Sequence, residues 1–154
     1  MELDIIHWKE GERPPVQLPD PRFLETLGEE GMRKLISDQY NLLVKSNIKN
    51  LFPSDREELE LAKKRAGDFF IQICGGPPYY KENRGLPMMT KRHEPFEITA
   101  KGRETWLGCY QEILPKLEQP KSLILSFWNY LNVFSLWMVN SPKTNPLQNL
   151  KFDA

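Results

Sequence analysis

Histidine and cysteine are the scarce residues of this chain, with two of each among 154 residues. Cys74 and Cys109 are too few to make a disulfide scaffold, and neither lies at metal-binding spacing from a histidine. We therefore expect two reduced, mostly buried thiols. The histidines are His7 and His93, so any chemistry that needs an imidazole must use one of them.

An excess of charge of one sign is also missing. Twenty-one basic and twenty-one acidic side chains give a formal net charge of +0, and there is no long run of like charges. This balance argues against nucleic acid or an anionic membrane surface as a partner, and it fits a small neutral or apolar ligand. No basic leader followed by an apolar stretch stands at the start of the sequence, so we expect a cytoplasmic protein.

No apolar run is continuous enough to indicate a membrane span. The most apolar segment, Leu123 to Val139, predicts a buried helix because polar residues interrupt it. The interruptions are Ser126, Asn129, Asn132 and Ser135. We expect no membrane insertion and one domain, long enough to close a core around a ligand.

Prolines concentrate near the start of the chain, where no helix can continue through them because proline lacks an amide donor. Residues 1–22 are therefore expected to form an extension that precedes a domain of residues 23–140, and residues 141–154 an irregular tail. His7 and Trp8 lie in the extension, which we interpret as a strap or a mobile tail with an incidental histidine. The prolines are Pro14, Pro15, Pro19 and Pro21.

Helical periodicity begins at Phe23, from which apolar residues recur at intervals of three and four and so share one face. This face comprises Met32, Leu35, Ile36, Tyr40, Leu43 and Val44. A short tight segment then stops at Pro53, and the acidic stretch that follows starts a second helix reaching about Cys74. The motif Gly75-Gly76-Pro77-Pro78 ends that helix, since glycine permits positive backbone angles and proline blocks continuation.

Residues 79–98 show little periodicity and are expected to be largely loop, with one helical turn at Met89 to His93. Thr99 suits the cap of a helix that reaches Leu114, and Pro120 suits the first turn of a last helix. No segment shows the alternation of apolar and polar residues that indicates a β-strand. The predicted fold class is all-α.

Four linked sequence blocks follow the second helix. They read Gly75-Gly76-Pro77, Gly85-Leu86-Pro87, Arg92-His93-Glu94-Pro95-Phe96-Glu97-Ile98 and Arg103-Glu104-Thr105-Trp106-Leu107-Gly108-Cys109. In order and spacing they resemble group II truncated hemoglobins, and the likeness extends more loosely from Phe23 to Pro142. The resemblance implies a truncated globin, a two-over-two helical sandwich around heme b (iron protoporphyrin IX).

His93 resembles the proximal iron ligand of that family. A lone histidine is otherwise more often a surface residue or a hydrogen-bonded core residue. Heme iron needs a neutral imidazole, and a histidine on a short segment can supply one when its other ring nitrogen meets a carbonyl. His93 is the only core candidate, since His7 lies in the extension.

The loop around His93 holds further candidates for contact with the heme. Arg92 is either a partner of a heme propionate or a solvated arginine, and Tyr80 is a candidate hydroxyl donor to a propionate. Met89, Phe96 and Ile98 are expected to wall the apolar side of the porphyrin, although ordinary core packing predicts the same burial.

Tyr40 and Trp106 resemble the distal hydrogen-bond donors of the family. Dioxygen takes up partial negative charge when it binds, so a buried donor slows its escape, and an indole can only donate. Core packing is the ordinary interpretation of both residues without the resemblance. Two departures from the family are Gln39, which replaces an aromatic residue, and the segment from Tyr40 to Phe52, which is one residue shorter.

Counting back from the double glycine places Ala62 and Ala66 where residues of the family overhang the ligand, one helical turn apart. Two alanines either leave room above the iron or only permit close helix packing. Phe52, Phe69 and Phe70 are the expected aromatic contacts of the heme on this side.

Three functions are compatible with these residues. The first is reversible binding of dioxygen or another diatomic ligand, which the resemblance implies to be tight and slowly released. The second is turnover of nitric oxide, nitrite or peroxide in the same pocket with an external reductase, since no flavin or nicotinamide domain is recognisable. The third is a helical interaction module without a cofactor, in which His93 would tolerate replacement by alanine.

Overall fold

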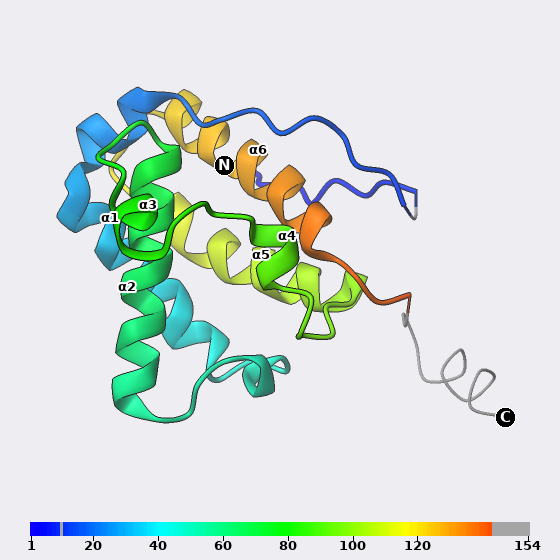
Figure 1. Ribbon diagram of the computed structural model, residues 1–154. Helices are drawn as coiled ribbons and strands as arrows, with labels where there is room; N and C mark the ends of the chain where they lie inside the picture. The colour runs from blue at the N-terminus through cyan, green and yellow to red at the C-terminus, as the bar shows by residue number, and fades with distance from the viewer. Residues whose placement is uncertain (10, 143–154) are drawn as a thin grey trace, which may run out of the picture.

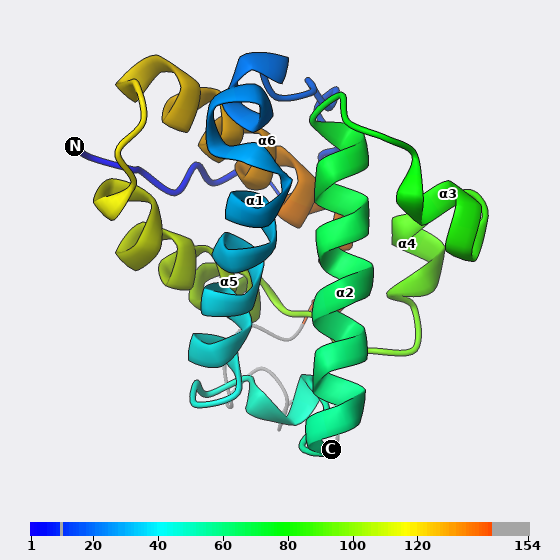
Figure 2. The ribbon, with the colours of Figure 1, turned by 90° about the vertical axis from the view of Figure 1, so that its left-hand side faces the viewer.

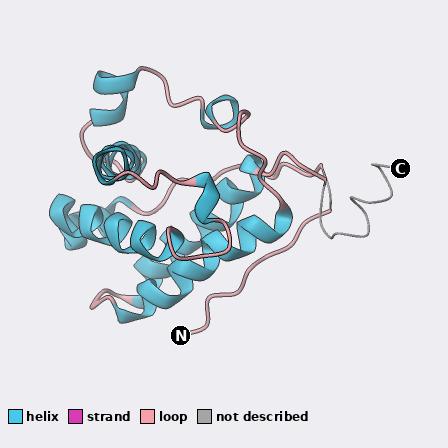
Figure 3. Cartoon of the chain, turned by 90° about the horizontal axis from the view of Figure 1, so that it is seen from below, coloured by secondary structure: helices cyan, strands magenta, loops and turns pink. Residues whose placement is uncertain are grey.

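The computed structural model describes residues 1–9 and 11–142, and within these ranges the chain is helix and loop without a strand (Figures 1 and 3). The all-α prediction is therefore confirmed. Of the predicted tail, all but Ser141 and Pro142 lies outside the described residues. The helices, with η for a 3₁₀ helix, are α1 (Pro21–Leu43), η1 (Lys49–Leu51), α2 (Arg56–Ile73), α3 (Tyr79–Arg84), α4 (Met89–Arg92), α5 (Ala100–Ile113), η2 (Leu114–Lys116) and α6 (Lys121–Met138).

Polar caps determine where two of the long helices begin. The side chain of Asp55 accepts a hydrogen bond from the amide of Glu58 at 3.0 Å, and Thr99 accepts one from the amide of Gly102 at 3.0 Å. Pro120 immediately precedes α6, where its missing amide costs nothing because the first helical amides have no partner within the helix. These starts agree with the sequence-based prediction.

The prediction that residues 79–98 are largely loop is wrong for α3. Six residues are too few to be helical through local propensity alone. Tertiary contacts hold the helix instead: the amide of Lys81 donates to Oε1 of Gln72 on α2 at 2.9 Å, and Tyr80 is buried. The predicted turn at Met89 to His93 is present as α4, with His93 at its C-terminal end.

Two helix pairs form the core. Helices α1 and α2 lie side by side and run in opposite directions, and α5 and α6 pack against them (Figures 1 and 2). At the centre, Phe23 of α1 stacks on Phe127 of α6 with ring centroids 4.8 Å apart, and Tyr110 of α5 meets Phe127 edge-on at 6.1 Å. Among the helices described, none is both long and apolar enough to cross a membrane.

The two thiols are buried and unpaired, as predicted. Burial raises the pKa of Cys74 to about 12 and that of Cys109 to about 11. Both side chains are therefore protonated at neutral pH and pack as small apolar groups.

Residues 3–8 form an N-terminal strap that lies along α6 (Figure 1). The indole of Trp128 donates to the carbonyl oxygen of Asp4 at 3.0 Å, and the amide of Ile6 donates to Oδ1 of Asn132 at 2.9 Å. Side chains of α6 therefore satisfy backbone groups of the strap that a free tail would leave to water.

Arg103 of α5 joins the strap to α6. Its guanidinium is almost fully buried and donates to the carbonyl oxygens of Ile6 and Asn132, each at 2.9 Å, and to Oγ of Ser135 at 2.9 Å. Burial lowers the pKa of Arg103, because removing the cation from water disfavours its charged form. A buried cation is tolerated only when its donors are paired, so the strap supplies a required acceptor.

Deleting residues 1–8 is expected to lower the free energy of unfolding by about 2–4 kcal/mol, because the deletion removes one acceptor of a buried cation and uncovers the surface beneath Leu3. Urea denaturation followed by circular dichroism measures the change. His7→Ala is the matched control, since the imidazole is exposed and its Nε2 lies 3.9 Å from the carboxylate of Glu104. Coincident unfolding curves for the deletion and the full chain would contradict this role of the strap.

Candidate functional site

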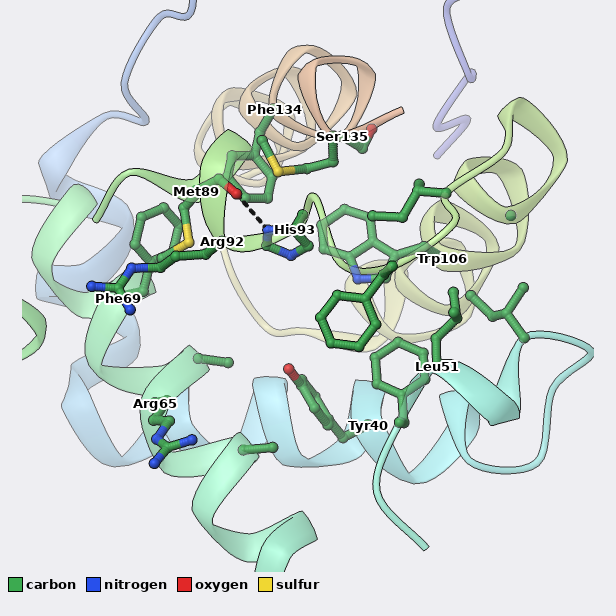
Figure 4. Close-up of a pocket in the computed structure, with 18 of the residues that line it drawn as sticks. Tyr40, Leu51, Arg65, Phe69, Met89, Arg92, His93, Trp106, Phe134 and Ser135 are labelled. Carbon is green, nitrogen blue, oxygen red and sulfur yellow. Dashed lines mark hydrogen bonds between the residues drawn. The ribbon is translucent and has the colours of Figure 1, made fainter. Parts of the chain in front are cut away.

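A cavity of about 410 Å³ opens between α1 and α2 on one side and α4, α5 and α6 on the other (Figure 4). This volume suits a cofactor or small ligand. Helices α1 to α6 and η1 all contribute to its lining, which is largely apolar. All residues predicted from the sequence to meet heme or ligand line it, namely Tyr40, Phe52, Ala62, Ala66, Phe69, Phe70, Tyr80, Met89, Arg92, His93, Phe96, Ile98 and Trp106.

His93 ends α4 and faces the cavity (Figure 4). Its Nδ1 lies 2.7 Å from the carbonyl oxygen of Met89. Because a carbonyl can only accept, Nδ1 carries the hydrogen of the neutral ring and Nε2 keeps its lone pair. Nε2 points across the cavity toward Tyr40 (Figure 4). The ring is thereby oriented as a neutral nitrogen ligand, whereas His7 lies on the strap away from this cavity.

A strained backbone position precedes the helix that carries His93. Met88 has φ 43° and ψ 49°, the left-handed conformation that residues other than glycine seldom adopt. Such strain persists only where the surroundings hold it, and it is often found at functional sites. The carbonyl of Met88 accepts the amide of Arg92 at 3.0 Å, so the strained residue begins the short helix that orients His93.

Arg92 holds the loop that precedes it. Its Nε donates to the carbonyl oxygen of Pro87 at 2.7 Å, and its Nη2 donates to those of Arg84 at 2.8 Å and Leu86 at 3.1 Å. The guanidinium carbon also lies 5.4 Å from the centre of the Tyr80 ring. Arg92 is therefore not a freely solvated arginine. Nη1 makes none of these bonds and can meet a carboxylate at the edge of the cavity.

Tyr40 projects from α1 into the cavity with its hydroxyl toward His93 (Figure 4). Burial raises the pKa of Tyr40 to about 12, so the phenol stays protonated and remains a donor at neutral pH. Phe52 packs edge-on against the Tyr40 ring with centroids 5.6 Å apart. The shorter segment between these two residues therefore still places both in the cavity.

Trp106 of α5 turns its indole nitrogen toward the same space (Figure 4). Tyr110 packs edge-on against the indole at 5.0 Å, and Phe134 of α6 lies 6.2 Å away. These rings fix the orientation of the indole, whose nitrogen can only donate. Two neutral donors, a phenol and an indole, thus converge on the space in front of His93.

Helix α2 closes the cavity with one face. Ala62 and Ala66 lie one turn apart on this face, and their small side chains leave space near Tyr40. Phe69 and Phe70 follow them, with Phe69 packed edge-on against Tyr80 at 5.9 Å. The residues predicted for this side of the site are therefore on one surface.

Several lining residues were not predicted from the sequence. Arg65 and Arg84 bring positive charge to the cavity, and together with Arg92 they also line an adjoining recess. Helical spacing could have indicated Arg65, which lies three residues after Ala62. Helix α6 adds Phe134, Ser135 and Met138, whose spacing on one helix face was equally visible.

Gln39 occupies the position where the sequence departs from an aromatic residue. Its side chain is fully buried, and Nε2 donates to the carbonyl oxygen of Trp106 at 3.5 Å. Oε1 has no hydrogen-bond partner among the residues that the structure describes. Gln39 thus connects α1 to α5 through a polar contact at the turn that carries Trp106.

The cavity fits a heme. His93 would hold the iron through a neutral nitrogen, and the walls are largely apolar, as a porphyrin requires. The arginines at its edge match the two carboxylates that a heme carries. The hydroxyl of Tyr40 faces the imidazole from the far side, and the indole nitrogen of Trp106 points into the same space (Figure 4). The helical fold and this site define a heme-binding globin.

Comparison with known proteins supports the assignment to the globins. Residues 23–140 match the family of bacterial-like globins, and the chain belongs to this family. It is 36% identical over 91 residues to group 2 truncated hemoglobin YjbI of Bacillus subtilis (strain 168), covering 58% of this chain and 67% of that protein. Within the globins, the chain is a group II truncated hemoglobin.

Two solved structures are also similar. Phosphate-bound Hell's gate globin IV superposes with a TM-score of 0.82 at 35% sequence identity, covering 96% of each chain. The truncated oxygen-avid haemoglobin from Bacillus subtilis superposes with a TM-score of 0.68 at 33% identity, covering 77% of this chain and 98% of that one. The two-over-two globin architecture therefore holds for this chain.

Proposed function

We propose that this protein binds heme b through His93 and reversibly binds dioxygen, or another diatomic ligand, on the opposite face of the heme. One observation carries the proposal: Nε2 of His93 and the hydroxyl of Tyr40 face each other across one cavity, into which the indole nitrogen of Trp106 also points (Figure 4). Bound heme would supply the iron at which the small ligand coordinates.

The apolar walls of the cavity and the polar residues at its edge would each hold a different part of the heme. Met89, Phe96 and Ile98 would contact its apolar surface, and the phenylalanines of α2 would add to these apolar walls. Arg92 and Tyr80 would bind the propionates, together with Arg65 and Arg84, which also line the cavity.

The opposite side of the cavity would retain the ligand. Dioxygen carries partial negative charge when bound, so hydrogen bonds from Tyr40 and Trp106 stabilise it and slow its release. The raised pKa of Tyr40 keeps its proton in place for this role. Ala62 and Ala66 leave room for the ligand to enter. The description of a structural relative as oxygen-avid supports tight binding.

Absorption spectra of the purified, heme-reconstituted protein test the proposal in the oxidised state, in the reduced state, and in the reduced state under oxygen. We expect a Soret band and an oxygenated spectrum that returns to the reduced one when oxygen is removed. A colourless protein after reconstitution would overturn the proposal and favour the cofactor-free interaction module. Immediate oxidation by oxygen would overturn reversible binding alone.

A second candidate function is turnover of nitric oxide, nitrite or peroxide. The two donors that favour a polar bound ligand, and the space beside the alanines, would equally serve such a substrate. Electrons would come from an external reductase. Steady-state turnover with a reductase distinguishes this function from binding alone, and a rate no higher than that of free heme would exclude it.

A further inference from the structure

The chain that leaves α6 returns to the loop that carries His93. Helix α6 ends at Met138, and Asn140 then lies against residues 93–98, which connect α4 to α5. Two segments far apart in the sequence therefore meet at the loop that begins with His93.

The side chain of Asn140 uses all its principal hydrogen-bonding groups on this loop. Nδ2 donates to the carbonyl oxygen of His93 at 3.2 Å and to that of Phe96 at 2.8 Å. Oδ1 accepts the amide of Ile98 at 3.0 Å. One primary amide has two donor hydrogens and one carbonyl oxygen, so all three groups are engaged.

The backbone adds two further bonds at the same place. The amides of Asn140 and Ser141 both donate to the carbonyl oxygen of Ile98, at 3.0 and 3.1 Å. These bonds tie His93, Phe96 and Ile98 to the segment that follows α6, an arrangement that we term the Asn140 clamp. Helix α6 itself contributes Phe134, Ser135 and Met138 to the cavity.

The loop needs such ties because α4 cannot position His93 alone. A helix of four residues is not stable by itself, and this one begins at a strained Met88. Arg92 fixes the loop that precedes His93 by donating three hydrogen bonds to backbone carbonyl oxygens. After the ring, the carbonyl oxygen of His93 accepts hydrogen bonds from Nδ2 of Asn140 at 3.2 Å and from the amide of Phe96 at 3.0 Å.

We propose that Asn140 is a positioning residue for His93, and this inference rests on the proposed heme function. By holding the His93 carbonyl, the clamp fixes the backbone from which the imidazole projects and couples His93 to the segment that follows α6. The role resembles that of outer-shell groups in metal sites, which orient a ligand without touching the metal.

Asn140→Asp tests the clamp most directly, because the aspartate has nearly the same shape and still accepts from Ile98 but loses both donor hydrogens. We expect heme loss to an excess of apomyoglobin to be about tenfold faster, the lower end of the cost of removing an outer-shell partner, because Asn140 bonds the backbone of His93 and not its ring. The iron–histidine stretching band of the reduced protein, measured by resonance Raman spectroscopy, should shift and broaden.

Two further variants complete the test. Asn140→Ala removes all three side-chain bonds, and amide exchange over residues 93–98 in the heme-free protein should become faster. Asn47→Asp is the matched control, since it places the same new charge at an exposed asparagine whose oxygen accepts from Thr105 at 2.9 Å, away from the clamp. Circular dichroism verifies that each variant is folded.

The outcomes separate the clamp from the proposed function. A normal wild-type heme spectrum with an unchanged iron–histidine band and heme-loss rate in Asn140→Asp would overturn the positioning role alone. Unchanged amide exchange in Asn140→Ala would overturn the clamp without reference to heme. A wild-type protein that takes up no heme would overturn the proposed function and, with it, the role of the clamp.

Discussion

Replacing His93 with glycine is expected to abolish stable heme binding. Loss of an outer-shell partner already costs about 10- to 100-fold in metal affinity, so loss of the ligand itself should exceed the upper end of this range. The glycine variant should release heme during gel filtration, while the wild type retains it and shows a Soret band.

Added imidazole provides the decisive control for this variant. The glycine leaves the space of the missing ring beside Met89, and free imidazole that occupies it should restore the heme spectrum. His7→Ala should bind heme as the wild type does, because His7 lies on the strap outside the cavity. Full heme retention by the glycine variant without imidazole would contradict the assignment of His93.

Replacing Trp106 with phenylalanine is expected to raise the oxygen dissociation rate by about 10- to 100-fold. The ring would still fill the space beside Tyr110, but the donor would be lost. A hydrogen bond to a charged group contributes about 1.5–3 kcal/mol, and about 1.4 kcal/mol corresponds to a factor of ten in rate. Stopped-flow displacement of oxygen by carbon monoxide measures the change.

Trp137→Phe is the matched control for this prediction, since the Trp137 indole donates to the carbonyl of Pro14 at 2.8 Å and is not among the residues lining the cavity. Its oxygen dissociation rate should equal that of the wild type. Tyr40→Phe and the double variant then show whether the two donors act on the same ligand. Equal dissociation rates in Trp106→Phe and the wild type would remove the indole from the proposed site.

Local signals in the sequence predicted most helix boundaries. Asp55, Thr99 and Pro120 were informative because a cap or a proline acts on the residues beside it. Helix α3 could not be predicted in this way. Its bond to Gln72 and the burial of Tyr80 depend on α2 lying alongside, which no local pattern reveals.

The candidate site was predictable to the extent that its residues lie in compact motifs. The blocks around His93 and Trp106 indicated residues that the structure places around one cavity. The contacts of Arg92 were not predictable, because its acceptors are backbone carbonyls and every residue type provides one. The contribution of Phe134 depends on how α6 crosses the cavity, which is a property of the whole fold.

The N-terminal strap also has a consequence for the order of folding. Ile6 and Asn132 are hydrogen-bonded across 126 positions, so the ribosome makes the strap long before its partner helix. Contacts of such separation form late, because a long loop must close first. We expect strap docking to be the last step of assembly. Until α6 has been synthesised, Arg103 of a nascent chain therefore lacks its hydrogen-bond acceptors on that helix, and the strap is accessible to proteases.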